Sequence, residues 1–418
     1  MTAQPTTEHL RLWLVNQYAL RIDQPGITRH ATLAKYMYPF GVRTTVFASD
    51  THYWNVADDA DAVPETEAPT FVYTSTPAVE SNGIKRVVSM LAFSARTLAK
   101  GLRGAQALGG PPQVVLGSSP HPFAALAAWV LSVRYRVPFV LEVRDLWPDS
   151  LVHLLGLGQR HPLIVALRVL ERFLYRRASL VITLLPGSER HITRVARRPV
   201  NTLWLPNGID LSRVPDATPP AEGPEFTVMY AGAHGIPNAL HTVVEAAEIL
   251  QTEGEERFRF VLVGDGKEKS NLVALAQQKR LENIDFRGAV SKATLLRLLP
   301  TADVLVITFK RTPLYQSGIS PNKVFDYLAA ARPVVIAVDT PLNPVAEADA
   351  GLTVAPEDPR ALADALRQLA ALPTGERAAY GMRGRAYVEE HNDLKRSGAR
   401  FAAALSETAK SRGISRRG

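Results

Sequence analysis

The sequence of 418 residues contains no cysteine, so disulfide bonds and thiolate chemistry are excluded. The absence of cysteine also fits a cytoplasmic protein. No apolar run approaches the roughly 20 residues that a membrane-spanning helix needs. The first residues lack the basic region and the apolar region of a signal peptide. We therefore expect a cytoplasmic protein without a transmembrane segment.

Several common catalytic motifs are missing as well. The sequence has no Gly-x-Ser-x-Gly elbow, no Walker phosphate loop, no Gly-x-Gly-x-x-Gly after the first predicted strand and no histidine pair at metal-ligand spacing. Asp59 and Asp61 match an Asp-x-Asp metal motif, but no apolar strand leads into them. We interpret these aspartates as part of a solvated loop, and we expect neither a bound metal nor another cofactor.

Basic residues outnumber acidic ones, with a formal net charge of +8 and an isoelectric point near 9.6. Such a balance favours an anionic partner, which could be a nucleic acid, an acidic membrane surface or a phosphorylated substrate. No basic tract with interleaved aromatic residues is present, so we do not expect nucleic-acid binding. The short basic end at 410–418 is typical of a disordered tail.

Short apolar strands alternate with amphipathic helices along the chain, and this pattern is typical of doubly wound α/β domains. The chain is also longer than the roughly 250–300 residues at which a single core stops growing. A segment rich in proline, glycine and acid divides it into two similar halves. We predict an N-terminal domain over 1–205, a linker over 206–225 and a C-terminal domain over 226–389, followed by a helix near 390–410 that packs back on the first domain.

The apolar runs locate the strands of both halves. Ligands of open α/β sheets bind beyond the carboxyl ends of the strands, so we expect the loops after these strands to face a central cleft between two Rossmann-like domains. The predicted strands are 10–18, 43–49, 113–119, 138–145, 179–185 and 202–208 in the first half, and 226–233, 259–266, 284–290, 302–308, 332–338 and 352–355 in the second.

The stretch SGISPNKVFDYL combines groups that suit an anion at the start of a helix. We predict Ser320 as the N-cap and Pro321 at the first helical position, with Asn322 and Lys323 beside the free N–H groups. Asp326, about one turn further on, could accept hydrogen bonds from whatever carries the anion. A nucleotide has both parts, a diphosphate and a ribose. Taken alone, the pattern fits an ordinary capped helix equally well.

Glycines and basic residues also follow other predicted strands of both halves. Glycine lets the backbone approach phosphate oxygens and lysine supplies charge, although a glycine after one strand is by itself an ordinary turn. Because several such loops meet at the same edge of a sheet, we interpret them together as walls of one nucleotide site. These candidates are Gly26 in the first half and Gly232, His234, Gly264, Lys267 and Lys269 in the second.

Polar residues that follow buried strands of the first half are the candidates for catalysis. His121 lies beyond the strand at 113–119, and Arg144 and Asp145 end the run at 138–145. Core filling explains them poorly because the buried part of each strand has already ended. A lone histidine is nevertheless more often structural than catalytic, and Arg144 and Asp145 could form an ion pair that braces the loop.

The order of several phrases resembles family-four glycosyltransferases with the GT-B fold, over nearly the whole chain. In the second half these phrases are YAGAHGIPNALHTVVEAAEIL, FVLVGDGKEK, ADVLVIT and SPNKVFDYLAAARPVV. In the first half NQYA, GITRH, GSSPHPF, EVRDLWPDSL and LERFLYRRA are similar to the fucosamine-transferase-like branch, which builds surface polysaccharides. The resemblance implies a retaining transfer of a sugar from a nucleotide-sugar, usually a UDP-sugar, to a saccharide acceptor without a metal.

Roles for the candidate residues follow from the same resemblance. It implies that His121 lies near the transferred sugar and that Asp326 binds the ribose hydroxyls. It places Gly26, Ser320, Asn322 and Lys323 at the donor diphosphate.

The chain departs from the family pattern at two places. The family has two glutamates with seven residues between them, whereas here the first position is Gly318 and the second is Asp326. The Arg and Lys that usually follow the YAG strand are also absent. Charge on the leaving group must then be met by the helix N-terminus, Lys323, and Lys267 or Lys269. A nucleotide-sugar 2-epimerase and a non-catalytic nucleotide-sugar-binding protein are the alternatives.

Two helices carry much of the basic charge. At about 100° per residue, the helix at 83–104 gathers apolar residues on one face and basic residues on the other, with Phe93 among the basic ones. Such a face is typical of helices that lie on anionic lipid, although a solvated helix gives the same pattern. We expect peripheral contact with the inner face of the plasma membrane and a polyprenyl-linked acceptor. The candidates are Lys85, Arg86, Phe93, Arg96, Lys100 and Arg103, with Arg168, Arg172 and Arg176 in the helix at 163–177.

Overall fold

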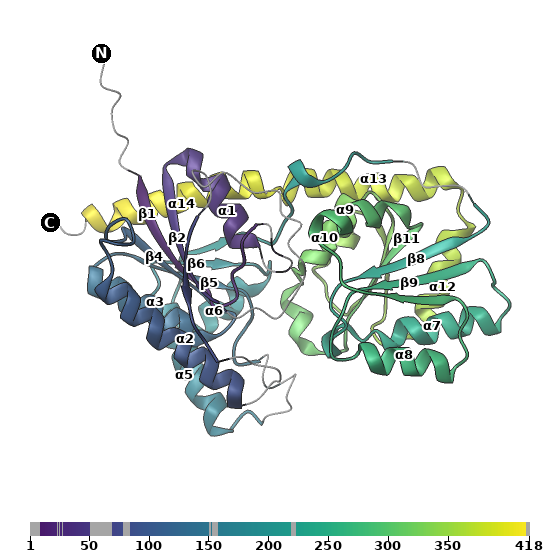
Figure 1. Cartoon of the computed structure of the whole chain (residues 1–418), viewed down its shortest axis with the longest axis horizontal. Helices are drawn as coiled ribbons and strands as arrows, with labels where there is room; N and C mark the ends of the chain where they lie inside the picture. Colours follow the sequence, from purple (N-terminus) through teal and green to yellow (C-terminus); the bar gives the residue numbers. More distant parts are fainter. Residues whose placement is uncertain are drawn as a thin grey trace, which may run out of the picture. The chain divides into compact units, whose positions relative to one another are not determined.

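The computed structural model describes residues 9–22, 24, 26, 28–50, 69–77, 84–149, 152, 158–218 and 223–414. The chain divides into two compact units: unit 1 comprises Met1–Pro206 and Leu394–Gly418, and unit 2 comprises Asn207–Asp393. Each unit has one parallel sheet with helices on both faces (Figure 1). The prediction of an α/β fold with two Rossmann-like domains is therefore confirmed.

The sheet of unit 1 has seven strands in the order β3-β2-β1-β4-β5-β6-β7, and all neighbouring strands are parallel. Strand β3 was not predicted, because it is an edge strand that is only partly buried and has no long apolar run. The strands are β1 (Leu10–Val15), β2 (Val42–Ser49), β3 (Thr70–Thr74), β4 (Val114–Ser118), β5 (Phe139–Val143), β6 (Leu180–Thr183) and β7 (Thr202–Trp204).

Both faces of this sheet are covered, because successive strand residues point to opposite sides. Leu12 and Leu14 of β1 pack in one core with α1 and α14, whereas Trp13 and Val15 pack in another with α2, α3 and α5. Helix α14 runs to Ile414, inside the segment predicted as a tail. The helices of unit 1 are α1 (Arg29–Met37), α2 (Ile84–Arg103), α3 (Pro122–Tyr135), α5 (Pro162–Arg177), α6 (Ser188–Ala196) and α14 (Leu394–Ile414).

The sheet of unit 2 has six parallel strands in the order β10-β9-β8-β11-β12-β13. Helices α7, α8 and α12 cover one face, and α9, α10 and α13 cover the other (Figure 1). The strands are β8 (Phe226–Ala231), β9 (Phe258–Val263), β10 (Ile284–Arg287), β11 (Val304–Thr308), β12 (Val334–Ala337) and β13 (Gly351–Val354). The helices are α7 (His241–Thr252), α8 (Lys269–Gln278), α9 (Lys292–Leu298), α10 (Asn322–Ala329), α11 (Pro344–Glu347), α12 (Pro359–Ala371) and α13 (Thr374–His391).

The strand order reverses next to the first strand of each sheet. In unit 1, β1 lies between β2 and β4, and in unit 2, β8 lies between β9 and β11. The loops that leave the carboxyl ends on the two sides of such a reversal diverge, which is why open α/β sheets bind ligands there. Across the described residues, no helix is both long enough and apolar enough to cross a bilayer.

Candidate functional site

Helix α10 begins without a side-chain cap. Pro321 occupies the N-cap position, so the prediction of Ser320 as the N-cap and Pro321 inside the helix is wrong by one residue. The Ser320 hydroxyl instead accepts a hydrogen bond from the backbone N–H of Asn207 at 3.0 Å. No described side chain accepts from the first-turn N–H groups of Asn322 and Lys323, which leaves the positive end of the helix dipole uncapped.

The Lys323 ammonium lies beside this helix start and has neutral partners. Its Nζ donates to the Tyr230 hydroxyl at 2.9 Å and to Asn238 Oδ1 at 2.6 Å. No carboxylate of the described residues pairs with it within 4.0 Å. Burial against these neutral groups lowers the pKa of Lys323 to about 7. An anion that binds here would meet a cation that the fold has not neutralised.

The loops after β8 and β9 approach each other so closely that a side chain would not fit. A Cβ atom added to Gly264 would lie 1.9 Å from the carbonyl oxygen of Gly232, and both residues have positive φ angles, 145° and 158°. His234, in the loop after β8, lies beside Gly264 and is fully buried. Neither of its ring nitrogens has a hydrogen-bond partner among the described residues. Burial and the nearby Lys269 lower its pKa to about 4, so its imidazole is neutral at pH 7.

The two lysines after β9 differ. Lys269 Nζ donates to the carbonyl oxygens of Gly264 and Arg287, both at 2.9 Å, so it braces the ends of β9 and β10. Lys267 is exposed and makes no such contact. The structure therefore gives Lys269 a bracing contact that the sequence did not predict, and it leaves Lys267 as the more accessible cation.

Asp326 is buried one turn into α10, where its carboxylate forms an ion pair with Lys292. The distance from Lys292 Nζ to Asp326 Oδ2 is 2.5 Å. Lys292 was not predicted as a partner, because it lies 34 residues away in the sequence, at the start of α9. An acid that accepts from Lys292 through one oxygen keeps the other for hydroxyl groups such as those of a ribose.

In unit 1, His121 is the N-cap of α3. Its Nδ1 accepts a hydrogen bond from the N–H of Ala124 at 3.2 Å, so the proton of the neutral ring is on Nε2. Burial, assisted by the charge of Arg86, lowers the pKa of His121 to about 3. The buried Nε2–H has no acceptor among the described residues. His121 therefore has a structural role through one nitrogen and an unused donor at the other.

Arg144 and Asp145 follow β5, as predicted, but no salt bridge within 4.0 Å joins them in the described structure. The N–H of Arg144 donates to the Ser119 hydroxyl at 3.3 Å, and its buried Nη1 has no partner among the described residues. Gly26, between β1 and α1, is exposed and has a φ angle of 120°. The alternative of a loop-bracing Arg144–Asp145 pair is thus wrong, and both side chains stay candidates for ligand contacts.

A buried polar network at the carboxyl edge of unit 1 escaped the sequence analysis. Glu142 accepts from His30 Nε2 at 2.6 Å, from Ser118 Oγ at 2.7 Å and from Arg29 Nε at 3.2 Å, and all four residues are buried. Burial alone would raise the pKa of Glu142, but His30 and Arg29 outweigh it and hold that pKa well below its usual value. A glutamate inside the apolar run FVLEV was the available signal, since a buried charge needs partners.

The comparisons with known families address both units. A model of the Glycosyl transferase 4-like domain matches residues 26–208, and a model of Glycosyl transferases group 1 matches residues 225–371. The first match ends near the boundary between the units, the second lies within unit 2, and together they cover the loops described above. The chain belongs to the GT-B glycosyltransferases.

Individual relatives agree with this assignment. A relative from Escherichia coli (strain K12), named for colanic acid biosynthesis as glycosyl transferase WcaI, is 26% identical over 278 residues, which is 63% of this chain and 67% of that protein. Sucrose-phosphate synthase from Thermosynechococcus elongatus superimposes with a TM-score of 0.72 at 16% identity, over 96% of this chain and 100% of the other. HepE from Anabaena, solved with UDP and glucose, has a TM-score of 0.67 at 16% identity over the same shares.

The helix α2 of this glycosyltransferase buries a different face from the one predicted. Phe93 is fully buried in the core of unit 1, so it cannot touch lipid and the prediction for it is wrong. Small and polar residues lie on the buried side with it, whereas the apolar stripe is exposed. That stripe comprises Val87, Val88, Leu91 and Leu102, which are 39%, 49%, 48% and 42% exposed. Ser89, Ser94 and Thr97 of the same helix are buried.

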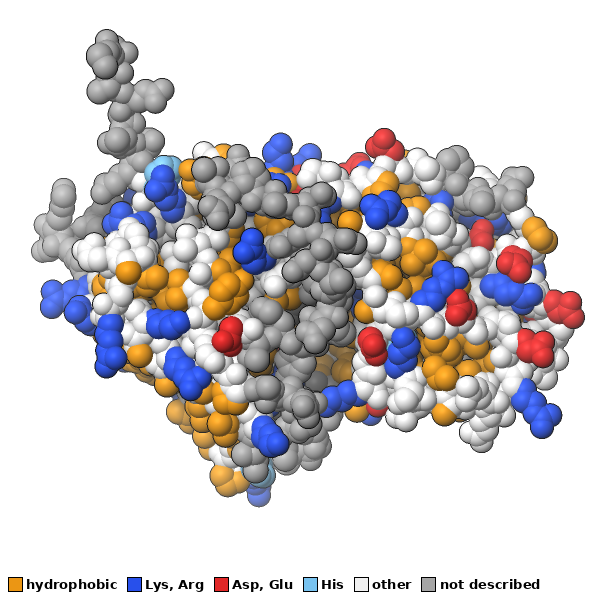
Figure 2. Space-filling view, in the orientation of Figure 1, with side chains coloured by type: hydrophobic (Ala, Val, Ile, Leu, Met, Phe, Trp, Pro, Cys, Tyr) orange, Lys and Arg blue, Asp and Glu red, His pale blue; other side chains and the backbone are white. Residues whose placement is uncertain are grey.

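Several predicted basic residues of the glycosyltransferase are held by neighbours. Arg96 and Lys100 donate to the carbonyl oxygens of Ser75 and Tyr73, and Arg168 pairs with Asp149 at 2.9 Å. Arg86 lies over the Tyr18 ring at 5.9 Å. Lys85, Arg103 and Arg176 are exposed and Arg172 is half-buried. Figure 2 shows such basic side chains next to apolar surface on the helices of unit 1.

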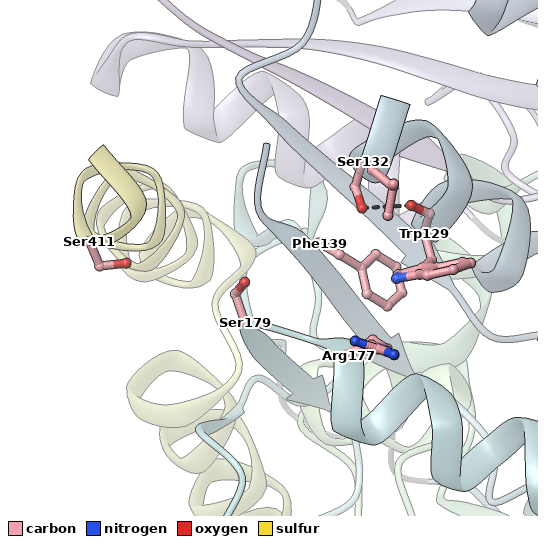
Figure 3. Close-up of a pocket in the computed structure, with 7 residues that line it drawn as sticks. Trp129, Ser132, Phe139, Arg177, Ser179 and Ser411 are labelled. Atoms are coloured by element: carbon pink, nitrogen blue, oxygen red, sulfur yellow. Dashed lines mark hydrogen bonds between the residues drawn. The ribbon is translucent and has the colours of Figure 1, made fainter. Parts of the chain in front are cut away.

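None of the predicted site residues lines a pocket of about 400 Å³ in unit 1 (Figure 3). Phe139 begins β5 and Ser179 precedes β6, so the pocket is at the amino ends of the strands and opposite the loops of His121 and Arg144. Open α/β sheets bind ligands at the other edge. It is lined by Trp129, Ser132, Val133, Phe139, Arg177, Ser179 and Ser411.

Proposed function

We propose that this chain is a retaining glycosyltransferase that moves a sugar from a UDP-sugar to a lipid-linked saccharide in surface polysaccharide synthesis. One observation carries the donor half of the proposal: within the part of the chain that the structure describes, the Lys323 ammonium contacts only neutral groups beside the uncapped start of α10. A helix N-terminus and an unpaired cation together suit a diphosphate. The Anabaena relative solved with UDP and glucose supports the choice of nucleotide.

The proposed chemistry is electrostatic. As the bond between the sugar and the diphosphate breaks, negative charge grows on the leaving phosphate, and preorganised donors stabilise that growth. In our proposal Lys323, Asn322 and the N–H groups of α10 supply these donors, so that no metal or cofactor is needed. Asp326, oriented by Lys292, accepts hydrogen bonds from the ribose, and Gly232 and Gly264 let the backbone approach the nucleotide.

His121 is the proposed catalytic residue in unit 1. Its buried Nε2–H donates to a hydroxyl of the transferred sugar, while Arg144 and Asp145 from the next loop contact the sugar or the acceptor. We assign no enzymic nucleophile, because a retaining transfer can let the departing phosphate accept the proton of the acceptor hydroxyl on the same face. The bond that breaks joins the sugar to the phosphate, and the bond that forms joins the sugar carbon to the acceptor oxygen.

We also propose that the exposed apolar stripe of α2 lies on the inner face of the plasma membrane, together with Leu163, Val165 and Val169 of α5. Apolar residues flanked by Lys85, Arg103 and Arg176 suit an anionic lipid surface. Changing Leu91 to Glu should lower salt-sensitive co-sedimentation with phosphatidylglycerol vesicles severalfold. Met382→Glu, at an exposed apolar site of unit 2, is the control and should have no effect. Equal binding of both variants contradicts the membrane proposal.

A donor panel tests the reaction itself. The protein is incubated with several UDP-sugars, each with and without a polyprenyl-diphosphate-linked saccharide, and the products are separated by mass spectrometry. Transfer to the lipid-linked acceptor with retained anomeric configuration is the expected result. Epimerisation of the donor without acceptor, or tight binding without any product, would replace the proposal with one of the two alternatives.

A further inference from the structure

The residue that begins unit 2, Asn207, is tied to the donor loop by two hydrogen bonds. Its backbone N–H donates to Ser320 Oγ at 3.0 Å, and its side-chain Nδ2 donates to the Ser320 carbonyl oxygen at 2.6 Å. Ser320 stands two residues before α10. One residue therefore fixes both the hydroxyl and the backbone of the segment that leads into the helix.

Asn207 is itself held from a second direction. Its carbonyl oxygen accepts from Asn392 Nδ2 at 3.0 Å, and the N–H of Ile209 donates to the Asn392 carbonyl oxygen at 3.0 Å. Both segments lie where the chain crosses between the units, at Pro206–Asn207 and at Asp393–Leu394. Asn207 is 5% exposed, so these bonds are sheltered from water.

The hydrogen bond to Ser320 leaves a donor free. A serine hydroxyl that accepts from an N–H still has its own hydrogen to donate. Oγ is held by the N–H of Asn207 and the carbonyl oxygen by Nδ2, so the hydroxyl hydrogen remains available as a donor two residues before the uncapped start of α10.

We propose that Asn207 is a positioning residue for the donor diphosphate, which it serves by holding Ser320 and the start of α10 in the geometry that binds phosphate oxygens. The inference rests on the proposed UDP-sugar donor and adds a residue that touches neither substrate. Its effect on binding passes through Ser320, and therefore concerns the phosphates more than the nucleoside.

The test compares Asn207→Ala with a matched control. Asn283 is equally buried in unit 2, and its Nδ2 donates to the Ala247 carbonyl oxygen at 3.0 Å, on the far side from α10. Both substitutions remove one amide-to-carbonyl hydrogen bond, so both should lower Tm by a similar amount. Only Asn207→Ala should weaken UDP binding. The expected loss of about fivefold in affinity corresponds to the net free energy of one such hydrogen bond.

Titration calorimetry with UDP, and competition by uridine, measure this difference on the full chain. We expect Asn207→Ala to lose affinity for UDP while its affinity for uridine stays within about twofold of the unaltered chain, and Asn283→Ala to keep both. Equal UDP affinity of the two variants, or an equal loss for UDP and uridine, overturns the positioning role alone. Failure of the unaltered chain to bind UDP overturns the proposed donor as well.

Discussion

The two units hold their central charged side chains in opposite ways. In unit 1 the buried Glu142 carboxylate accepts from Arg29, His30 and Ser118. In unit 2 the Lys323 ammonium contacts a phenol and an amide oxygen, and no acid among the described residues. Both groups lie at the edge of a sheet where a ligand would bind, so their position does not distinguish them.

We propose that this difference separates a charge that stabilises the fold from a charge that binds a ligand. The Glu142 network is complete within the fold, and Arg29 also donates to the carbonyl oxygens of Leu205 and Pro206, so the network ties the end of unit 1 to α1. Such buried pairs hold a structure together, and removal of one member is costly. The pKa of Lys323 is lowered to about 7 because the ammonium is buried without a countercharge from any described residue. Binding of an anion would therefore stabilise its charged form. Four experiments examine the contrast.

The largest effect should follow from Glu142→Gln. It leaves Arg29 buried without a countercharge and should lower the free energy of unfolding of unit 1 by about 3–5 kcal/mol. All five tryptophans lie in unit 1, so their fluorescence during urea unfolding reports this unit alone. Asp149→Asn, which breaks the more exposed pair with Arg168, should cost less than about 1 kcal/mol. Similar costs for the two variants would remove the contrast.

The His121→Ala variant tests whether unit 1 also contains a functional polar group. Loss of the Nε2–H donor should lower kcat/KM for transfer by about 100-fold, as for other donors aimed at a reacting centre. His161→Ala is the matched control, since His161 also caps a helix through Nδ1, at the exposed start of α5. Both variants should lose about 1 kcal/mol of stability from the cap. A kcat/KM equal to that of His161→Ala would make His121 purely structural.

Lys323→Met should weaken UDP-glucose binding by about 10- to 100-fold without lowering Tm. A charge-assisted hydrogen bond to phosphate is lost, whereas the folded protein loses a half-buried cation that no acid compensates. Lys279→Met breaks an ion pair at 2.6 Å between the residue that follows α8 and Glu248 of α7. This control should lower Tm and leave UDP-glucose binding intact. If Lys323→Met destabilises the protein and binds UDP-glucose normally, Lys323 belongs with Glu142 as a structural charge.

The smallest effect concerns pH. In the free protein Lys323 is half protonated near pH 7, and a bound diphosphate raises its pKa, so binding takes up a proton. Affinity for UDP-glucose is therefore highest below pH 7 and falls above it, to about one tenth at pH 8 relative to pH 6. UDP-glucose is the suitable probe because its diphosphate does not titrate in this range. A flat profile, or one unchanged in Lys323→Met, would show that another group controls binding.

The loops of the site could be predicted, but not the contacts of their side chains. Glycines after β8 and β9 and the SPNK stretch indicated the edge at which we propose that the nucleotide binds, because glycine and an N-terminal helix turn have local signatures. The ion pair of Asp326 with Lys292 and the hydrogen bond of Ser320 with Asn207 have no local sequence signature, because the partners are 34 and 113 residues apart. The buried face of α2 was misjudged for a related reason: apolar periodicity shows that a stripe exists, and only packing decides whether it is covered.

By itself the sequence determined the α/β class, the division into two parallel sheets and the strand ends at which polar loops gather, because alternation of short apolar runs and helices is a local property of the chain. Tertiary structure alone decided which charges are neutralised. Glu142 contacts Arg29, which is 113 residues away in the sequence, whereas Lys323 contacts Tyr230 and Asn238 but no acid that the structure describes. Coulomb energy depends on the distance between charges in space and on their burial, and neither quantity can be read from the order of the residues.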